Sequence, residues 1–183
     1  MKTYNIIKNE NINYNIFRNQ TINMDNNKQD RILHWNNVKD NYSWHSGVNY
    51  RLNPYLYKIG KGEQGVLTCE PYKSEILPFW KFATPELAEQ SSNNIYAMFL
   101  KYLENNDFIG ADMSRKFLMM GFTRSRRYAN HKSGRKYSSV DGTQLPLDID
   151  EEKAKSADIF KEKWLLANRN QQYIEMKSAW PSK

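Results

Sequence analysis

The most regular hydrophobic pattern lies in the middle of the chain, after residue 84. Between Thr84 and Asn105, apolar residues recur every three or four positions, and this spacing places them on one face of an α-helix. Thr84 followed by Pro85 is typical of a helix start, because a threonine hydroxyl caps the first turn and proline needs no amide partner there. We therefore predict a helix from Thr84 to about Asn105.

A second apolar stripe follows directly. It consists of Ile109, Met113, Phe117 and Met120. These positions predict a helix over residues 107–120. Gly121 comes next, and glycine often ends a helix because it adopts positive φ without steric cost. We therefore expect this helix to stop at Gly121 and a separate short helix to span residues 123–130.

Two more helices are predicted towards the end of the chain. Asp150, Glu151 and Glu152 place negative charge where a helix dipole favours it, at a helix start. The expected buried face of that helix consists of Ala154, Ala157, Phe160, Trp164 and Ala167. A last helix is expected over residues 170–179, before Pro181.

The first half of the chain has a different pattern. Residues 42–82 are dense in aromatic side chains and are interrupted by glycine and proline, which predicts irregular structure with short strands. The best strand candidates are residues 65–69 and the alternating residues 12–16. The predicted fold class is therefore α+β, with a mainly helical C-terminal half and an aromatic-rich, loop-rich segment that carries short strands. We expect an Asn-rich N-terminal arm over residues 1–39 and a single globular domain over residues 40–183.

Composition narrows the class of protein. Hydrophobic residues make up 39% of the 183 residues, which is enough for a core. Cys69 is the single cysteine, and no stretch approaches the roughly 18 apolar residues of a membrane span. Residues 1–10 lack the apolar core of a secretory signal. These observations predict an intracellular protein in a reducing compartment, with no membrane partner.

The charge is concentrated in one segment. Residues 113–140 hold eight basic residues and no acidic one, so their excess of +8 accounts for the whole net charge of +7. Local excess of this kind indicates an anionic partner more strongly than a diffuse basic composition does. The candidate nucleic-acid-binding residues are Arg115, Lys116, Arg124, Arg126, Arg127, Tyr128, Asn130, His131, Lys132, Arg135 and Lys136, with Tyr137 interleaved. Guanidinium groups bind phosphates in pairs of hydrogen bonds, and Tyr and His stack on bases. The competing interpretation, equally weighted, is a solvated helix face whose arginines pair with the acidic helix at residues 85–112.

Three segments in fixed order carry a family resemblance. They are residues 57–67 (YKIGKGEQGVL), 70–78 (EPYKSEILP) and 121–132 (GFTRSRRYANHK). Together they resemble the family called domain of unknown function 4385, which is associated with T4-like and cyanobacterial phages, giant viruses and some algae and plants. The resemblance covers about Tyr42 to Met176 and leaves the Asn-rich arm outside. It implies a viral or phage-like setting and assigns no activity.

Other motifs favour simpler interpretations. The glycine-rich residues 58–65 lack the spacing of a Walker loop or a dinucleotide-binding loop, so a tight turn is favoured over a phosphate site. Glu63, Glu70 and Glu75 near Lys73 do not reproduce a nuclease signature, and ordinary ion pairs are favoured.

The histidines and the cysteine do not suggest a catalytic or metal site. His34, His45, His131 and Cys69 are too scattered for a zinc site, and we do not favour a nucleophilic pair of Cys69 and His131. No metal and no cofactor is expected.

The leading functional hypothesis is a nucleic-acid-binding accessory protein, with DNA as the expected partner, in viral or phage-like replication, repair or packaging. One alternative is a nucleic-acid-processing enzyme such as a nuclease. In it, Glu63, Glu70 or Glu75 supplies a carboxylate beside Arg124, Arg127, His131 and Lys132. Another is a structural or interaction protein with an acidic protein partner. The sequence leaves the oligomeric state open.

Overall fold

Capping residues and a tight turn set the first two long helices beside each other. The computed structural model describes residues 42–131 and 134–181, and the elements named below lie in the unit Ser43–Lys183. Helix α3 (Pro85–Glu104) begins after Thr84, whose hydroxyl accepts a hydrogen bond from the amide of Leu87. After a turn of three residues, helix α4 (Phe108–Asn130) starts at Asp107, whose carboxylate accepts from the amide of Gly110. The helix predicted over residues 84–105 is confirmed.

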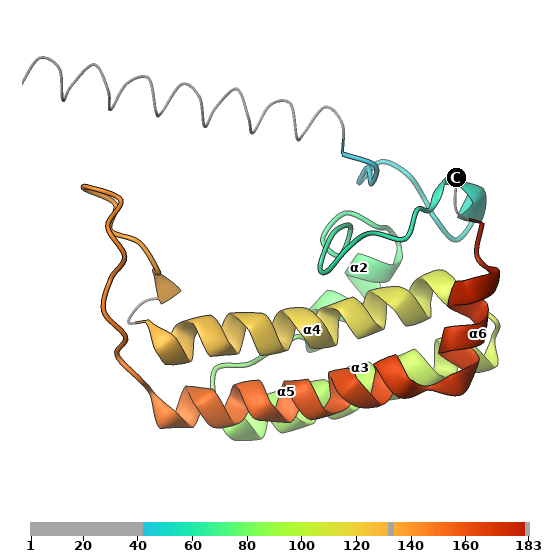
Figure 1. Ribbon diagram of the computed structural model, residues 1–183. Helices are drawn as coiled ribbons and strands as arrows, with labels where there is room; N and C mark the ends of the chain where they lie inside the picture. Colours follow the sequence, from blue (N-terminus) through green and yellow to red (C-terminus); the bar gives the residue numbers. More distant parts are fainter. Residues whose placement is uncertain (1–41, 132–133, 182–183) are drawn as a thin grey trace, which may run out of the picture. The chain divides into compact units, whose positions relative to one another are not determined.

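Helix α4 is the centre of a three-helix bundle. It packs against α3 and against α5 (Glu151–Arg169), and α3 and α5 also touch (Figure 1). Every residue from Phe108 to Leu118 is buried. The short helix α6 (Gln171–Ala179) follows α5 after the cap Asn170, which confirms the helix predicted over residues 170–179, and it packs on α4 and α5. Within residues 42–131 and 134–181, no helix is long and apolar enough to cross a membrane.

The expected helix stop at Gly121 was wrong, and so was the separate helix over residues 123–130. Helix α4 continues through Gly121 to Asn130. A Cβ atom at Gly121 would lie 2.3 Å from the ring of Phe160 on α5. Gly121 therefore lets the two helices approach closely and has no terminating role.

The α+β prediction was also wrong. The described residues contain no strand, and extended pairing there is limited to isolated bridges between Asn49 and Glu70 and between Tyr137 and Gln144. Residues 65–69, the predicted strand, form successive turns, because the amides of Thr68 and Cys69 both donate to the carbonyl of Gly65. The predicted strand at 12–16 and the arm at 1–39 lie outside the described residues.

The segment before α3 is irregular and carries short helical turns. These are η1 (Pro54–Leu56), α2 (Tyr72–Ile76) and η2 (Leu77–Phe79). The sequence analysis did not predict α2. Its buried side chains Tyr72 and Ile76 hold this segment against the bundle, where α2 packs on α4.

Candidate functional site

The second half of α4 carries a polar face. Thr123 lies on this face, and Arg126, Arg127 and Asn130 share the face because they follow Thr123 by three, four and seven residues. Together with the segment that follows α4, this face encloses a cavity of about 660 Å³, which we call the basic groove. The wall of the basic groove includes His131, Arg135, Lys136 and Tyr137.

The wall begins at a tight turn. Gly134 has a φ of +70°, and its amide donates to the carbonyl of His131 over 2.8 Å. A Cβ atom at Gly134 would lie 2.8 Å from the ring of Tyr128. Glycine therefore allows the turn to rest on Tyr128, and the chain doubles back beside the end of α4.

The same segment is tied to α4 where it returns. The amide of Asp148 donates to the carbonyl of Asn130 over 3.0 Å, and the amide of Asp150 donates to the carbonyl of Ala129 over 2.8 Å. These bonds satisfy carbonyls at the C-terminal end of α4 that have no partner within the helix. The segment that forms the wall of the basic groove is thus attached at both ends to α4, which forms the floor.

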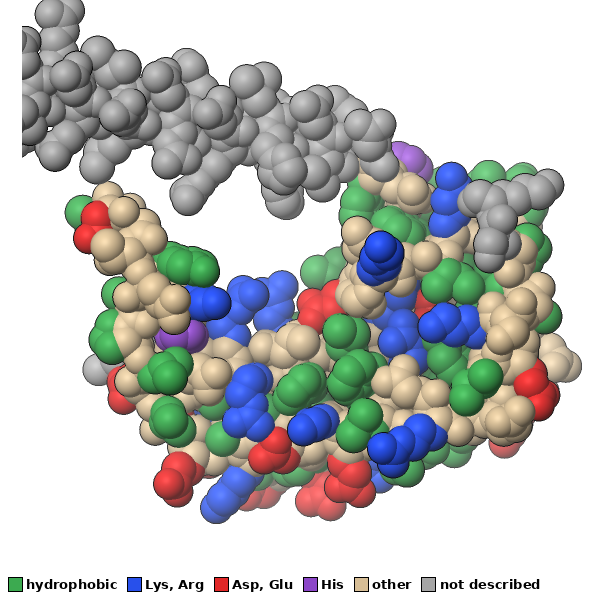
Figure 2. Space-filling model, viewed as in Figure 1, with side chains coloured by type: hydrophobic (Ala, Val, Ile, Leu, Met, Phe, Trp, Pro, Cys, Tyr) green, Lys and Arg blue, Asp and Glu red, His purple; other side chains and the backbone are tan. Residues whose placement is uncertain are grey.

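The basic groove has an excess of positive charge. Arg126 forms a 2.6 Å ion pair with Asp158 on α5, and both side chains are exposed. Arg127, Arg135 and Lys136 form no ion pair with any residue that the structure describes. Figure 2 shows Lys and Arg side chains gathered in the hollow beside the segment that follows α4. An anion entering the basic groove therefore meets three uncompensated cations.

His131 is the most unusual member of the groove lining. Only 6% of its surface is exposed, and its Nδ1 atom has no hydrogen-bond partner among the described residues. Leaving a buried polar atom unpaired costs roughly 1–3 kcal/mol, so native proteins rarely do it. The unpaired atom belongs to a residue that lines the basic groove.

The predicted nucleic-acid-binding residues do not all lie together. Arg126, Arg127, Asn130, His131, Arg135 and Lys136 line the basic groove. Arg124 is half-buried and Tyr128 is exposed, and neither is part of the lining. Lys132 lies outside the described residues. Arg115 and Lys116 are buried in the bundle, on a part of α4 that solvent does not reach.

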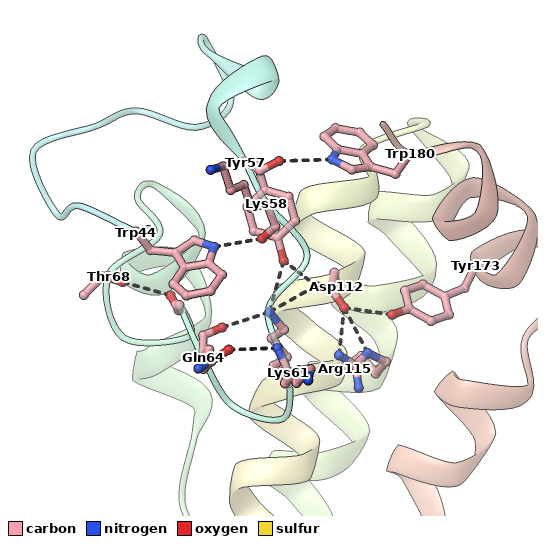
Figure 3. Close-up of polar contacts among 12 residues, drawn as sticks. Trp44, Tyr57, Lys58, Lys61, Gln64, Thr68, Asp112, Arg115, Tyr173 and Trp180 are labelled. Atoms are coloured by element: carbon pink, nitrogen blue, oxygen red, sulfur yellow. Dashed lines mark hydrogen bonds and ion pairs between the residues drawn. The ribbon is translucent and has the colours of Figure 1, made fainter. Parts of the chain in front are cut away.

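The side chains of Arg115 and Lys116 belong to a buried ion cluster (Figure 3). At its centre is Asp112, which is fully buried. Its Oδ1 accepts from Arg115 Nε at 3.0 Å, from Arg115 Nη2 at 2.8 Å and from the hydroxyl of Tyr173 at 2.8 Å. Its Oδ2 accepts from the hydroxyl of Tyr57 and lies 3.3 Å from Lys116 Nζ. One carboxylate thus serves two cations and two phenols.

The cluster keeps its carboxylate ionised. Burial alone would raise the pKa of Asp112, but the charges of Lys116 and Arg115, together with the hydrogen bonds from Tyr57 and Tyr173, outweigh burial and lower it to about 2. Burial, together with the neighbouring charge of Arg115, lowers the pKa of Lys116, and Asp112 restores only part of it. Burial and the neighbouring Asp112 raise the pKa of Tyr57 well above its usual value, so the phenol stays a hydrogen-bond donor.

Lys116 also holds the glycine-rich residues 58–65. Its Nζ donates to the carbonyl of Gln64 over 2.8 Å and lies 5.7 Å from the ring centroid of Trp44. The indole of Trp44 donates to the carbonyl of Lys58 over 2.9 Å, and a Cβ atom at Gly65 would lie 2.9 Å from that indole. The segment is a run of turns packed on Trp44 and Lys116.

The acidic residues considered for a nuclease separate in space. Glu70 pairs with Lys73 at 2.5 Å, and Glu75 receives both terminal nitrogens of Arg51 at 2.7 Å. Glu63 accepts a hydrogen bond from the hydroxyl of Thr123 at the edge of the basic groove. Among the described residues, no group of three His, Cys, Asp or Glu side chains is placed to hold a metal ion.

Cys69 is equally unsuited to catalysis. It is completely buried, and burial raises the pKa of its thiol to about 12. The protonated thiol is a weak nucleophile.

Sequence reasoning missed the buried cluster although one signal was present. Lys116 lies seven residues after Ile109 and four before Met120, so it falls on the apolar stripe that was expected to be buried. The two phenols gave no such signal, because Tyr57 and Tyr173 lie 55 and 61 residues from Asp112. Their meeting depends on how the chain folds back over α4.

The comparisons with known proteins give one match. A family model described as "Domain of unknown function (DUF4385)" matches residues 40–183. Neither the curated proteins nor the solved structures contain a match.

Proposed function

The chain belongs to the family described as a domain of unknown function (DUF4385), and we propose that it is a nucleic-acid-binding accessory protein whose basic groove holds the phosphate backbone. One observation carries the proposal. Arg126, Arg127, Arg135 and Lys136 come from a helix and from the segment after it, and they line one concave surface. Arginine binds phosphate oxygens in pairs of hydrogen bonds, and such contacts supply most of the affinity for nucleic acid.

The setting that we propose follows from the family resemblance. It is DNA replication, repair or packaging of a virus or phage, inside a reducing compartment. The buried, protonated Cys69 is compatible with such a compartment.

The geometry gives less support to a nuclease. A metal-dependent nuclease needs carboxylates that converge beside the phosphate. In this protein Glu70 and Glu75 are paired with Lys73 and Arg51, and no carboxylate lines the basic groove. Plain binding therefore accounts for the groove with fewer assumptions.

The proposal is tested by fluorescence anisotropy with a labelled DNA of arbitrary sequence. If the four groove cations each contact a phosphate, log Kd should rise with log salt with a slope near 3.6 on duplex, from roughly 0.9 per contact. The groove variant replaces Arg126, Arg127, Arg135 and Lys136 by Gln. It should bind much more weakly, with a flatter salt dependence.

A matched control removes the same charge elsewhere. Lys81, Lys101, Lys155 and Lys177 are exposed and lie outside the basic groove, so their replacement by Gln also lowers the net charge from +7 to +3. This control should keep most of the affinity and the slope. Equal losses in both variants would reject the groove as the binding surface, and no binding by the parent at low salt would reject the function. Stronger binding of an acidic polypeptide such as polyglutamate than of DNA would favour an acidic protein partner instead.

A further inference from the structure

Phosphate binding does not explain every group in the basic groove. His131 lines the groove, and its buried Nδ1 atom has no hydrogen-bond partner among the described residues. An unpaired buried polar atom costs free energy, so a groove occupant that forms a hydrogen bond with His131 would be stabilised there.

Tyr137 adds an aromatic surface to the same lining. Tyr137 is 55% exposed, so a face of its ring is accessible to an occupant of the groove. Lys136 Nζ lies 5.4 Å from the centroid of its ring. An exposed ring beside cations is what single-stranded nucleic-acid sites use to stack a base while neighbouring charges hold the backbone.

Two amide side chains complete the polar lining. Asn130 lies on the floor and Gln144 on the wall, and neither side chain forms a hydrogen bond with a residue that the structure describes. A side-chain amide both donates and accepts, so it matches the edge of a base. The basic groove thus combines charge for phosphate, a ring for stacking and amides for hydrogen bonding.

We propose that the basic groove takes an unpaired nucleotide of a single strand, with the base against Tyr137 and His131 and the phosphates on Arg127 and Arg135. This inference rests on the proposed function. A cavity of about 660 Å³ has the size of a small-ligand site. In a duplex the faces of the bases are covered by stacking, so only an unpaired base can present its face to Tyr137.

The test compares three labelled probes of equal length at constant salt. They are a single-stranded oligothymidine, the corresponding duplex, and a single strand of abasic residues that keeps the phosphates and lacks the bases. The parent protein should bind the oligothymidine at least tenfold more tightly than the abasic strand, because stacking on an aromatic side chain contributes strongly per base. Equal affinity for these two probes would overturn the proposal.

Substitutions at two groove residues, Tyr137 and His131, test which side chains hold the base. Tyr137→Ala should weaken oligothymidine binding about tenfold and leave abasic-strand and duplex binding within twofold. His131→Leu should weaken oligothymidine binding, and His131→Asn should restore part of it, since the Asn amide provides a polar atom near the position of Nδ1. Tyr55→Ala is the matched control, because Tyr55 is 79% exposed and lies outside the groove lining, and it should change nothing.

The outcomes separate the two proposals. Circular dichroism and the melting temperature confirm that each variant is folded. If duplex binding depends on the groove cations while Tyr137→Ala and His131→Leu affect all probes equally or not at all, the nucleotide pocket is wrong and nucleic-acid binding stands. If no probe binds the parent, both proposals fail.

Discussion

Replacing Asp112 by Asn is the sharpest test of the buried ion cluster. The substitution keeps the size of the side chain and removes its charge, so Arg115 and Lys116 remain inside the bundle without a counter-charge. Breaking a buried pair in this way costs about 3–5 kcal/mol of unfolding free energy, because an uncompensated charge is left in the interior. Lys116 can release its proton, since burial already lowers its pKa, so we expect a loss near 3 kcal/mol.

The measurement is thermal unfolding followed by circular dichroism, with urea unfolding as an independent check. For a chain of this length, a loss of 3–5 kcal/mol lowers Tm by roughly 6–20 °C. Asp158→Asn is the matched control, because it breaks an exposed ion pair with Arg126. Exposed pairs contribute at most about 1 kcal/mol, so the control should unfold close to the parent.

The pH dependence provides a second measurement with a defined sign. The folded state lowers the pKa of Asp112 from 3.8 to about 2. The resulting stabilisation, about 2 kcal/mol, is present above pH 4 and disappears as pH falls through the folded-state value. Asp112→Asn cannot titrate, so the stabilities of parent and variant should converge in acid and separate towards neutral pH.

A third variant distinguishes an uncompensated charge from lost packing. Replacing Asp112, Arg115 and Lys116 together by Leu, Leu and Met removes all three charges and keeps a similar total side-chain volume. Apolar replacement of a whole buried ion cluster is often neutral or stabilising, so the triple variant should recover most of the stability. The reasoning is refuted if Asp112→Asn is no less stable than Asp158→Asn, or if the triple variant is as unstable as Asp112→Asn.

Three further predictions address packing, charge and domain organisation. Gly121→Ala should lower the unfolding free energy by about 1–3 kcal/mol in urea titrations, since its Cβ would overlap a ring of α5 at 2.3 Å, whereas Gly47→Ala meets no atom within 4 Å and should be neutral. Asp158→Asn should tighten oligonucleotide binding in an anisotropy titration, because it releases Arg126 from its ion pair, and unchanged affinity would argue against a role for Arg126. Deleting residues 1–39 should leave cooperative thermal unfolding largely intact, because the helices that pack together, α2 to α6, all begin after residue 71, and loss of the transition would show that the arm is integral.

The sequence predicted the elements whose causes are local. Thr84, Asp150 and Asn170 each cap a helix through a side-chain hydrogen bond to an amide three residues on, and each marks a helix start that the pattern had indicated. Such bonds involve neighbours in the chain, so composition and spacing suffice to find them.

The elements that were mispredicted depend on distant partners. Gly121 has the composition of a helix end, but the ring of Phe160 approaches its backbone, and this contact comes from another helix. Residues 65–69 have the composition of a strand, but Trp44 packs on Gly65 and the segment turns instead. Tertiary contacts override local propensity at both places.

The candidate site was predicted in part for the same reason. The concentration of cations in residues 113–140 is a property of the sequence, but the direction in which each side chain points is a property of the helix in its bundle. Lys116 points into the core, whereas Arg127 lies on the exposed face of the same helix. The number of cations in residues 113–140 is therefore larger than the number that a ligand can contact.

The contacts that α6 and its C-cap residue Trp180 make with the core form late in the synthesis of the chain. Tyr173 supplies a hydrogen bond to Asp112, and the indole of Trp180 donates to the carbonyl of Tyr57 over 3.1 Å. A nascent chain emerges from the ribosome N-terminus first, so Asp112 and its two cations leave the tunnel before either aromatic partner exists. Both contacts with the interior between residue 57 and α4 are missing until residue 180 has left the tunnel. A chain arrested before α6 lacks both contacts and exposes an unfinished charged interior to the cell's quality control.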